Sequence, residues 1–209
     1  MAGIYIHIPF CKSRCRYCDF FSTTQLDKRE AYIQAVIQEW ESHQPKWSQQ
    51  EIRTIYLGGG TPSLIPIESL RLLLHSILSS IDTSHVQEIT LEANPGDITA
   101  EKIRAWKDMG INRLSMGVQS FDDTLLQLIG RRHTAEQTVS AFKMARHYGF
   151  DNINMDLIAA LPGETPEIFF ESLNNQTEET LFSCSLLKVD IDTFPTLLFL
   201  FLNQTLCQR

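Results

Sequence analysis

The stretch IYIHIPFCKSRCRYCDFF, residues 4–21, joins a run of alternating apolar residues to a loop that holds three cysteines. The alternation over Ile4–Ile8 predicts a strand with isoleucines on one face and Tyr5 and His7 on the other. The loop that follows carries the thiols of Cys11, Cys15 and Cys18. Because one loop at the end of a strand holds all three, we expect the chemistry of the protein at that end.

Further β-rich runs follow, separated by amphipathic helical runs, as far as about residue 172. This alternation of strands and helices predicts an α/β fold with a parallel sheet. The further strands are predicted at Ile52–Leu57, Gln87–Glu92, Ile111–Gln119 and Asn152–Ile158, with a sixth around Leu186–Ile191.

The helical runs have recognisable ends and apolar stripes. Helix starts are predicted at Asp27 with Glu30, Thr134 with Gln137, and Thr165 with Pro166. Helix ends are predicted at Gly110 and Gly149. Stripes that predict core-facing sides are Tyr32, Val36 and Trp40, and Leu70, Leu74, Ile77, Leu78 and Ile81.

Polar residues gather where the predicted strands end. The second strand runs into a glycine triplet, and Glu92, Gln119 and Asp156 lie at or near the ends of later strands. In parallel α/β folds the carboxyl ends of the strands meet at one rim, where active sites are built. We therefore expect these residues to join the cysteines at that rim.

Composition and charge narrow the class of protein. The 209-residue chain is 43% hydrophobic, as globular proteins are, and its formal net charge of −7 argues against broad nucleic-acid binding. The N-terminus lacks a secretory pattern, and the apolar run 194–202 is shorter than the about 20 residues of a membrane helix. We expect a cytoplasmic protein without an integral membrane segment, in which close-set cysteines bind metal more often than they form disulfides.

Three thiols in one loop suit some metal sites better than others. A structural zinc site takes four ligands, commonly as two pairs, and the sequence offers no second pair. A redox pair of Cys15 and Cys18 would leave Cys11 without a role. A [4Fe–4S] cluster ligated at three irons, with the fourth iron open, uses all three thiols. The sequence favours the cluster, and a zinc-stabilised binding module is the competing hypothesis.

The spacing Cys11-x3-Cys15-x2-Cys18 resembles the CxxxCxxC motif of the radical S-adenosylmethionine (SAM) superfamily. The resemblance implies that the open iron binds SAM, and that an electron from the cluster cleaves SAM to a 5′-deoxyadenosyl radical. It also implies that Tyr17, between the second and third cysteines, lies against the adenine of SAM. Packing within the loop is the alternative role for Tyr17.

A second motif, YLGGGTPS at 56–63, follows the second predicted strand. It lacks the lysine of a phosphate-binding loop and the last glycine of a dinucleotide fingerprint. Glycines let ligand groups approach the backbone closely, although a plain tight turn would also use them. In the family that this sequence resembles, the segment holds the methionine part of SAM, which implies Gly60 and Thr61 as contacts.

Further motifs narrow the resemblance to the oxygen-independent coproporphyrinogen III oxidases and the related HemW-type haem chaperones. The similar segments run from about residue 3 to 172 and include IYIHIPFC, LGGGTPS, LSMGVQSF and DLIAALPGET. The resemblance implies a partial (β/α) TIM-like barrel of parallel strands as the radical SAM core, shortened at its C-terminus. By position it implies SAM contacts at Tyr5, Gly60, Thr61 and Glu92, and a second SAM at Gly59, Gln119, Arg131 and Asp156.

The same polar residues have a structural alternative. Glu92 and Asp156 near buried strand ends would be costly without partners, and Arg131 is one candidate partner. A purely structural network at the rim therefore stays open beside SAM binding, and so does the use of a second SAM.

Two features separate the branches of this family. The oxidases carry the longer motif CxxxCxxCxC and have an N-terminal extension before it. In this sequence Phe20 takes the place of the further cysteine, and ten residues precede Cys11. Both features favour the haem-chaperone branch, which implies haem or porphyrin as a ligand and haem-accepting respiratory proteins as partners. Coproporphyrinogen dehydrogenation is the alternative function, so whether the protein is an enzyme stays open.

The last part of the chain departs from the family pattern. We expect a radical SAM core domain over 1–174 and an atypical tail over 175–209, as in a truncated or frame-shifted product. Cys184 and Cys207 in this tail are interpreted as incidental thiols, and the six histidines include no pair that suggests a metal site.

Overall fold

The computed structural model describes residues 2–47, 50–174 and 183–188. Within this part, six parallel strands form one sheet in the order β1-β2-β3-β4-β5-β6. The strands are β1 (Ala2–Ile8), β2 (Ile52–Gly59), β3 (Glu88–Ala93), β4 (Arg113–Gln119), β5 (Asn152–Ala159) and β6 (Ser183–Lys188). The helices are α1 (Arg29–Trp47), α2 (Ile67–Leu78), α3 (Ala100–Asp108), α4 (Asp123–Leu128), α5 (Ala135–His147) and α6 (Pro166–Asn174).

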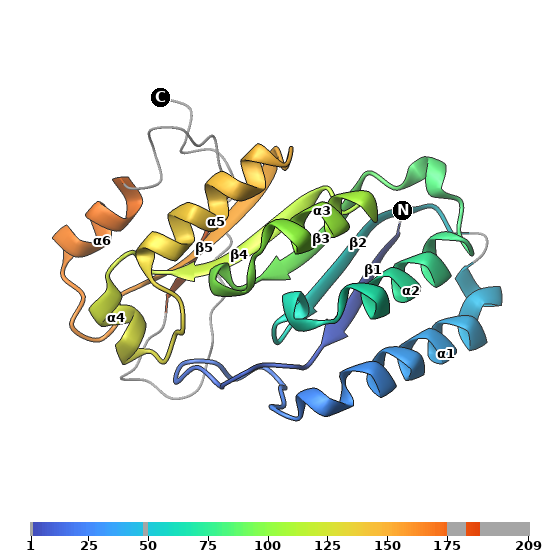
Figure 1. Ribbon diagram of the computed structural model, residues 1–209, viewed down its shortest axis with the longest axis horizontal. Coiled ribbons are helices and arrows are strands. Elements are labelled where there is room, and N and C mark those ends of the chain that lie inside the picture. The colour runs from blue at the N-terminus through green and yellow to red at the C-terminus, as the bar shows by residue number, and fades with distance from the viewer. Residues whose placement is uncertain (1, 48–49, 175–182, 189–209) are drawn as a thin grey trace.

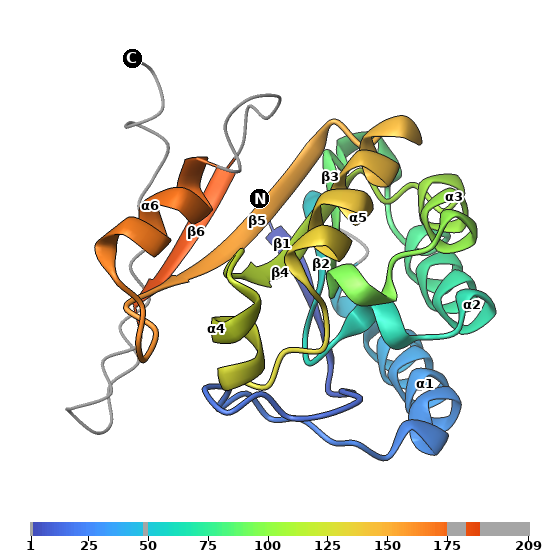
Figure 2. The same cartoon turned by 60° about the vertical axis from the view of Figure 1, so that its left-hand side comes forward.

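The sheet is curved and is covered by helices on one face. Figure 1 shows α1, α2, α3 and α5 along that face, and Figure 2 shows the sheet curving from β1 toward β6. β1 and β6 stand at the two ends of the strand order, so the described sheet is open. The predicted α/β fold, a partial (β/α) barrel of parallel strands, is confirmed.

The main apolar core lies between the helices and the sheet. Strand residues such as Leu91 and Leu114 are fully buried, as are Leu74 of α2 and Trp106 of α3. Burial of each large apolar side chain contributes about 1.5–3 kcal/mol, so this layer supplies most of the stabilisation of the fold.

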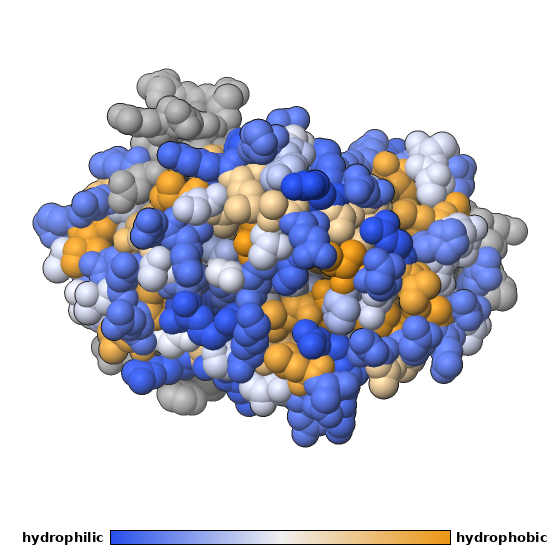
Figure 3. All heavy atoms as spheres, in the orientation of Figure 1, coloured by the Kyte–Doolittle hydropathy of each residue, from blue (hydrophilic) through white to orange (hydrophobic). Residues whose placement is uncertain are grey.

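The predicted helical stripes face this core. Tyr32, Val36 and Trp40 of α1 pack against it while partly buried, and the stripe of α2 is buried or packs against it in the same way. Figure 3 shows the helix-covered face of the molecule as mainly hydrophilic with scattered apolar areas, as expected where amphipathic helices turn their polar sides outward.

Most of the predicted helix ends are confirmed. Thr134 and Gln137 form a capping box at the start of α5, and Thr165 Oγ1 accepts from Ile168 N at the start of α6. Gly110 and Gly149 adopt φ of +88° and +83° after α3 and α5. The predicted start at Asp27 is wrong. This residue lies in a 3-10 turn, Leu26–Lys28, and α1 begins at Arg29, whose Nε donates to the carbonyl of Leu26 at 2.7 Å.

Where the ends of the first five strands differ from the prediction, they differ by one or two residues. β4 begins at Arg113 and not at Ile111, although Asn112 N–H still donates to the carbonyl of Ile89 on β3 at 3.1 Å. Asn112 Oδ1 accepts from Ile89 N–H, and its Nδ2 donates to the carbonyl of Gln87, each at 2.8 Å. A side-chain oxygen thus takes the place of a backbone carbonyl as acceptor, and the regular ladder begins at the next residue.

The C-terminal predictions are covered only in part. β6 overlaps the strand predicted around Leu186–Ile191 and includes Cys184. Residues 175–182 and 189–209, with Cys207, lie outside the described residues, so the predicted tail stays a prediction. No helix in the described part of the chain is long and apolar enough to cross a membrane.

Candidate metal and cofactor site

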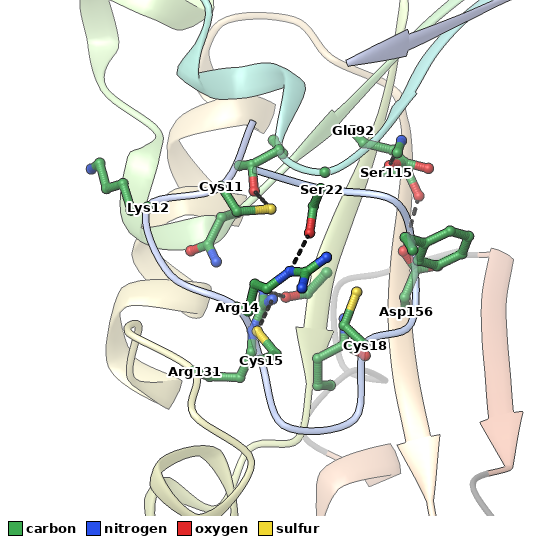
Figure 4. A pocket seen from close by; sticks show the side chains of 18 of the residues that line it. Cys11, Lys12, Arg14, Cys15, Cys18, Ser22, Glu92, Ser115, Arg131 and Asp156 are labelled. Atoms are coloured by element: carbon green, nitrogen blue, oxygen red, sulfur yellow. Dashed lines mark hydrogen bonds between the residues drawn. The ribbon is translucent and has the colours of Figure 1, made fainter. Parts of the chain in front are cut away.

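The cysteine loop leaves β1 and lies at the carboxyl ends of the strands (Figure 4). Cys11 N–H donates to the carbonyl of Thr23 at 2.9 Å, which closes the base of the loop. Arg16 N–H donates to the carbonyl of Ile129, after α4, at 3.0 Å. The three thiols of the loop are free and partly buried. Backbone hydrogen bonds to other segments therefore hold the loop that presents the thiols.

The thiols line a cavity of about 520 Å³. Every residue that the sequence analysis assigned to the site lines the same cavity: Tyr5, Cys11, Cys15, Tyr17, Cys18, Gly59, Gly60, Thr61, Glu92, Gln119, Arg131 and Asp156. The parallel sheet thus brings together groups from the ends of its first five strands, as predicted for the rim.

The wall of the cavity is the face of the sheet that turns away from the helices. In β4, Ser115 and Gln119 line the cavity, whereas their neighbours Leu114 and Val118 belong to the core. Because successive strand residues point to opposite faces, each strand contributes to both layers.

Glu92 is held by two donors from β2. The hydroxyl of Tyr56 donates to Oε1 at 2.7 Å, and Gly59 N–H donates to Oε2 at 3.0 Å. Burial raises the pKa of the Glu92 carboxyl above its ordinary value, and these two hydrogen bonds partly oppose the shift. Burial and the nearby charge of Glu92 also raise the pKa of Tyr56. The carboxyl is oriented, with lone pairs left to accept from hydroxyls of a ligand.

Asp156 is held from within its own part of the sheet. Ser115 Oγ donates to Oδ2 at 3.1 Å, and Asn154 Nδ2 donates to Oδ1 at 2.6 Å. Asn154 Nδ2 also lies 3.3 Å from Ser115 Oγ. The second carboxylate of the cavity therefore has neutral hydrogen-bond donors on β4 and β5.

Arg131 has other contacts than the sequence analysis suggested. Its Nη2 donates to the carbonyl of Gly117, and its Nη1 lies 3.6 Å from Cys15 Sγ. The described hydrogen bonds of Glu92 and Asp156 come from other donors, so the suggested pairing of Arg131 with them is not observed. Arg131 instead joins the end of β4 to the cysteine loop, because neighbouring strands already satisfy the carboxyls.

Two polar atoms on residues assigned to the site have no hydrogen-bond partner among the described residues. They are Gln119 Oε1 and Arg131 Nε, both buried. Gln119 also adopts a φ of +71°, in the left-handed region that costs a residue with a Cβ about 1–2 kcal/mol. Buried unpaired polar atoms and a strained backbone cluster at functional sites, and here both lie on one residue of the lining.

The glycine triplet is required partly by β1. Gly59 has a φ of +112°, and a Cβ there would lie 2.5 Å from the ring of His7. A Cβ at Gly60 would lie 2.8 Å from the carbonyl carbon of Pro9. Close packing against the first strand and the residues after it is therefore a structural reason for part of the glycine motif, apart from any contact with a ligand. Thr61 Oγ1 lies 3.6 Å from Cys11 Sγ and links the motif to the thiols.

The two aromatic residues that the sequence singled out lie at different depths. Tyr17 packs against a small apolar cluster that includes Leu125 and Ile129, and burial raises the pKa of its hydroxyl. Tyr5 is 58% exposed and stacks on Tyr56 with ring centroids 6.0 Å apart. Packing of Tyr17 is observed, and its contact with adenine stays a prediction.

Sequence reasoning missed several residues of the lining. Tyr56, Ser115 and Asn154 orient the two carboxyls, and Arg113 lines the cavity at the start of β4. A signal was present, since Asn154 lies two positions before Asp156 and Ser115 lies four positions before Gln119 on otherwise apolar strands. Polar residues with a period of two on a buried strand indicate a second, solvated face.

Curated relatives of similar sequence come from bacteria. The heme chaperone HemW of Lactococcus lactis is 43% identical over 165 residues, which cover 78% of this chain and 42% of the relative. HemW of Bacillus subtilis is 42% identical, over 83% of this chain and 46% of the relative. An oxygen-independent coproporphyrinogen-III oxidase-like protein, HemZ of Bacillus subtilis, is 37% identical over 86% of this chain and 37% of the relative.

A solved structure shares the fold. Coproporphyrinogen III oxidase HemN of Escherichia coli superposes with a TM-score of 0.81 at 30% identity, over 89% of this chain and 43% of that one. The chain therefore spans less than half the length of the relatives that it matches here.

The cysteines fit an iron–sulfur cluster better than a single metal ion. Thiolates are soft ligands that suit such clusters. Among the described residues, no three side chains of His, Cys, Asp or Glu lie close enough together to hold one ion. The three thiols nevertheless face one cavity of about 520 Å³, as expected for thiolates that bind different irons of a cluster.

The family assignment rests on the whole core and not on the cysteines alone. The model of the radical SAM superfamily matches residues 5–174, which include every strand from β2 to β5 and the cysteine loop. Membership implies a [4Fe–4S] cluster and SAM as cofactors. The curated relatives, the shared fold and this match agree, and the chain belongs to the radical SAM superfamily.

Proposed function

We propose that this chain carries the cluster- and SAM-binding part of a haem chaperone, which binds haem and passes it to haem proteins. The relatives of highest identity reported above are named heme chaperones, and the similarity covers their cysteine loop and core. Since the chain spans less than half of their length, the activity of a whole protein is part of the proposal.

The proposal includes roles for the residues that line the cavity. We assign cluster ligation to Cys11, Cys15 and Cys18, and SAM contacts to Tyr5, Tyr17, Gly60, Thr61 and Glu92. We assign a second SAM position to Gly59, Gln119, Arg131 and Asp156. When bound, the cluster supplies an electron for the cleavage of SAM, while the chain's own residues orient the ligand and shield it from water.

The observation that carries the haem proposal is a pair of exposed phenylalanines beside the cavity. Phe20 lines the cavity and is 47% exposed, and the adjacent Phe21 is 77% exposed. Exposed phenyl rings beside a cavity suit a planar apolar macrocycle, because each ring buries 150–250 Å² when covered. Phe20 also stands where the oxidase motif carries a further cysteine, which an aromatic side chain cannot replace as a ligand.

Arg14 supplies a charge that fits the carboxylates of haem. It lines the cavity, and its described hydrogen bond goes from Nε to the neutral Ser22 Oγ at 3.1 Å. Lys12 and Arg132 share the carboxylate of Asp97, and Arg113 pairs with Glu88, so each of those cations already has an anionic partner. Arg14 is therefore the group best suited to a propionate at the mouth of the cavity.

A metal and haem titration tests the proposal. After anaerobic reconstitution we expect about four irons per chain, and loss of the iron in Cys11→Ala, Cys15→Ala or Cys18→Ala. Cys184→Ala is the matched control, because it removes a thiol outside the loop and should keep the iron. Haem added to the reconstituted chain should bind in one-to-one ratio, and the affinity should fall about tenfold in Arg14→Gln but not in Arg16→Gln.

The alternative function is coproporphyrinogen III oxidation, and the likeness to HemN supports it. If the protein converts coproporphyrinogen III and consumes SAM, it is an oxidase, and the chaperone proposal is rejected. Colourless protein with one zinc per chain and no iron would reject both in favour of a zinc-stabilised module.

The remaining expectations belong to the same proposal. We infer a core domain over 1–174, an atypical tail over 175–209 and a cytoplasmic location, with haem-accepting respiratory proteins as partners. Size-exclusion and pull-down experiments with haem-free respiratory subunits would detect the transfer partner, and haem that stays on the chain in their presence would argue against transfer.

A further inference from the structure

A fully buried carboxylate lies beside the site but does not line the cavity. Asp97 has a side chain with 0% exposure, in the connection between β3 and α3. Lys12 Nζ approaches its Oδ1 at 2.6 Å, and Arg132 Nη2 approaches its Oδ2 at 3.1 Å. Each carboxylate oxygen therefore has a cationic partner of its own.

The two partners come from different connections at the rim. Lys12 belongs to the cysteine loop after β1, next to Cys11 (Figure 4). Arg132 belongs to the connection between α4 and α5, next to Arg131, which itself contacts Cys15 Sγ. One carboxylate thus joins the cysteine loop to the segment that supplies Arg131.

Asp97 itself is rigidly held. Its N–H donates to the carbonyl of Asn94 at 2.9 Å, and the side chain of Asn94 accepts from Gly96 N at 3.0 Å. Lys102 Nζ donates to the carbonyl of Asp97 at 3.2 Å and to that of Ser63, beside the glycine motif, at 2.8 Å. Asp97 is therefore fixed in the connection after β3 and is also joined to the connection after β2.

A buried carboxylate needs its partners, and here the partners are more exposed than it is. The Lys12 and Arg132 side chains are 45% and 35% exposed. Losing the carboxylate would free two cations to enter water, while losing a cation would leave a buried charge short of a partner. The contact therefore restrains the segments that carry Lys12 and Arg132 more than it stabilises the core.

We propose that Asp97 is a positioning residue that fixes the cysteine loop against the α4–α5 connection before any cluster binds. It touches neither thiol nor ligand and acts through Lys12 and Arg132. A loop that is ordered in advance loses less conformational entropy when its thiols close on a cluster. This role concerns the assembly of the site and does not depend on haem binding.

Limited digestion with trypsin of the full chain without cluster tests this role. The cysteine loop contains Lys12, Arg14 and Arg16 as cleavage sites. Asp97→Asn should speed cleavage after Arg14 and Arg16 about tenfold, because a hydrogen bond to a charged group contributes about that factor to local opening. Glu88→Gln is the matched control, since it breaks the ion pair with Arg113 at the other end of β3 and should leave loop cleavage unchanged.

A second variant keeps the test decisive if Asp97→Asn unfolds. Lys12→Gln removes only the half-exposed partner and should raise cleavage after Arg14 and Arg16 in the same direction. In the double variant the two effects should not add, since both remove the contact between Lys12 and Asp97. After reconstitution, both single variants should also lose iron to a chelator about tenfold faster than Glu88→Gln.

Two results would overturn the role. One is wild-type cleavage in folded Asp97→Asn and Lys12→Gln, and the other is an equal increase in Glu88→Gln. Because the digestion uses neither haem nor cluster, a chain that fails to bind haem leaves this test unaffected.

Discussion

The two faces of the sheet are built from alternating residues of the same strands, yet they are chemically opposite. Leu114 is fully buried beneath the helices, while its neighbour Ser115 hydrogen-bonds Asp156 on the cavity side. In β3, Leu91 and Glu92 repeat this contrast. The helix face holds the fold by apolar burial, and the cavity face holds oriented polar groups.

The difference shows how one set of strands separates stability from function. On the cavity face, the burial of Glu92 and the left-handed backbone of Gln119 both destabilise the folded state. The helix face offsets these costs through its continuous core. Substitutions on the two faces should therefore change the free energy of unfolding by different amounts, and in some cases with opposite sign.

The largest expected contrast is between Leu114 and Ser115. Leu114→Ala should lower the free energy of unfolding by about 3 kcal/mol, because it removes buried methyl groups and leaves a cavity. Ser115→Ala removes one hydroxyl and its hydrogen bonds and should cost about 1 kcal/mol. Urea titrations of both variants measure the contrast. Equal losses in the free energy of unfolding would contradict the assignment of stability to the helix face.

The second prediction concerns His133, which is buried in the connection between α4 and α5. Its Nε2 lies 3.0 Å from the carbonyl of Val118. Burial, with the charge of Arg131, lowers its pKa from 6.5 to about 4. A lowered folded-state pKa gives stability that is present above the unfolded value and is lost as the pH falls from 6.5 toward 4.

We expect up to about 3 kcal/mol of lost stability across this window, since one pKa unit corresponds to about 1.4 kcal/mol. Urea titrations between pH 7 and pH 4 measure the loss, which should be much smaller in His133→Gln. The same pH slope in both proteins would show that other groups produce it.

The smallest effect is expected at Glu92, with the opposite sign. A folded-state pKa that burial has raised favours the protonated form, so the stability tied to it is lost as the pH rises through the folded pKa. Glu92→Gln should therefore be as stable as wild type at acid pH and more stable at neutral pH. The gain should stay below about 1 kcal/mol, because the hydrogen bonds from Tyr56 and Gly59 oppose the burial effect.

Thermal unfolding of both proteins at pH 4 and pH 7 measures this gain. A loss of stability in Glu92→Gln at neutral pH would place Glu92 among the groups that hold the fold together. The cavity face would then contribute to stability as the helix face does.

Local signals in the sequence anticipated much of the fold. The β-rich runs located the first five strands to within one or two residues, and Thr134 with Gln137 marked a helix start correctly. Asp27 misled because capping-box spacing also occurs where the backbone forms a 3-10 turn first. The start of β4 was missed because the side chain of Asn112, and not a backbone carbonyl, accepts the hydrogen bond from Ile89 N–H of β3.

By itself, the sequence determined the parallel α/β order and many of the side chains at the rim, since strand direction and alternation follow from local pattern. Only the tertiary structure decided which of these groups touch. Arg131 contacts Gly117 and Cys15 and not the expected carboxyls, and Asp97 joins Lys12 to Arg132. Such contacts form between connections far apart in the chain, and their partners depend on how the curved sheet brings those connections together.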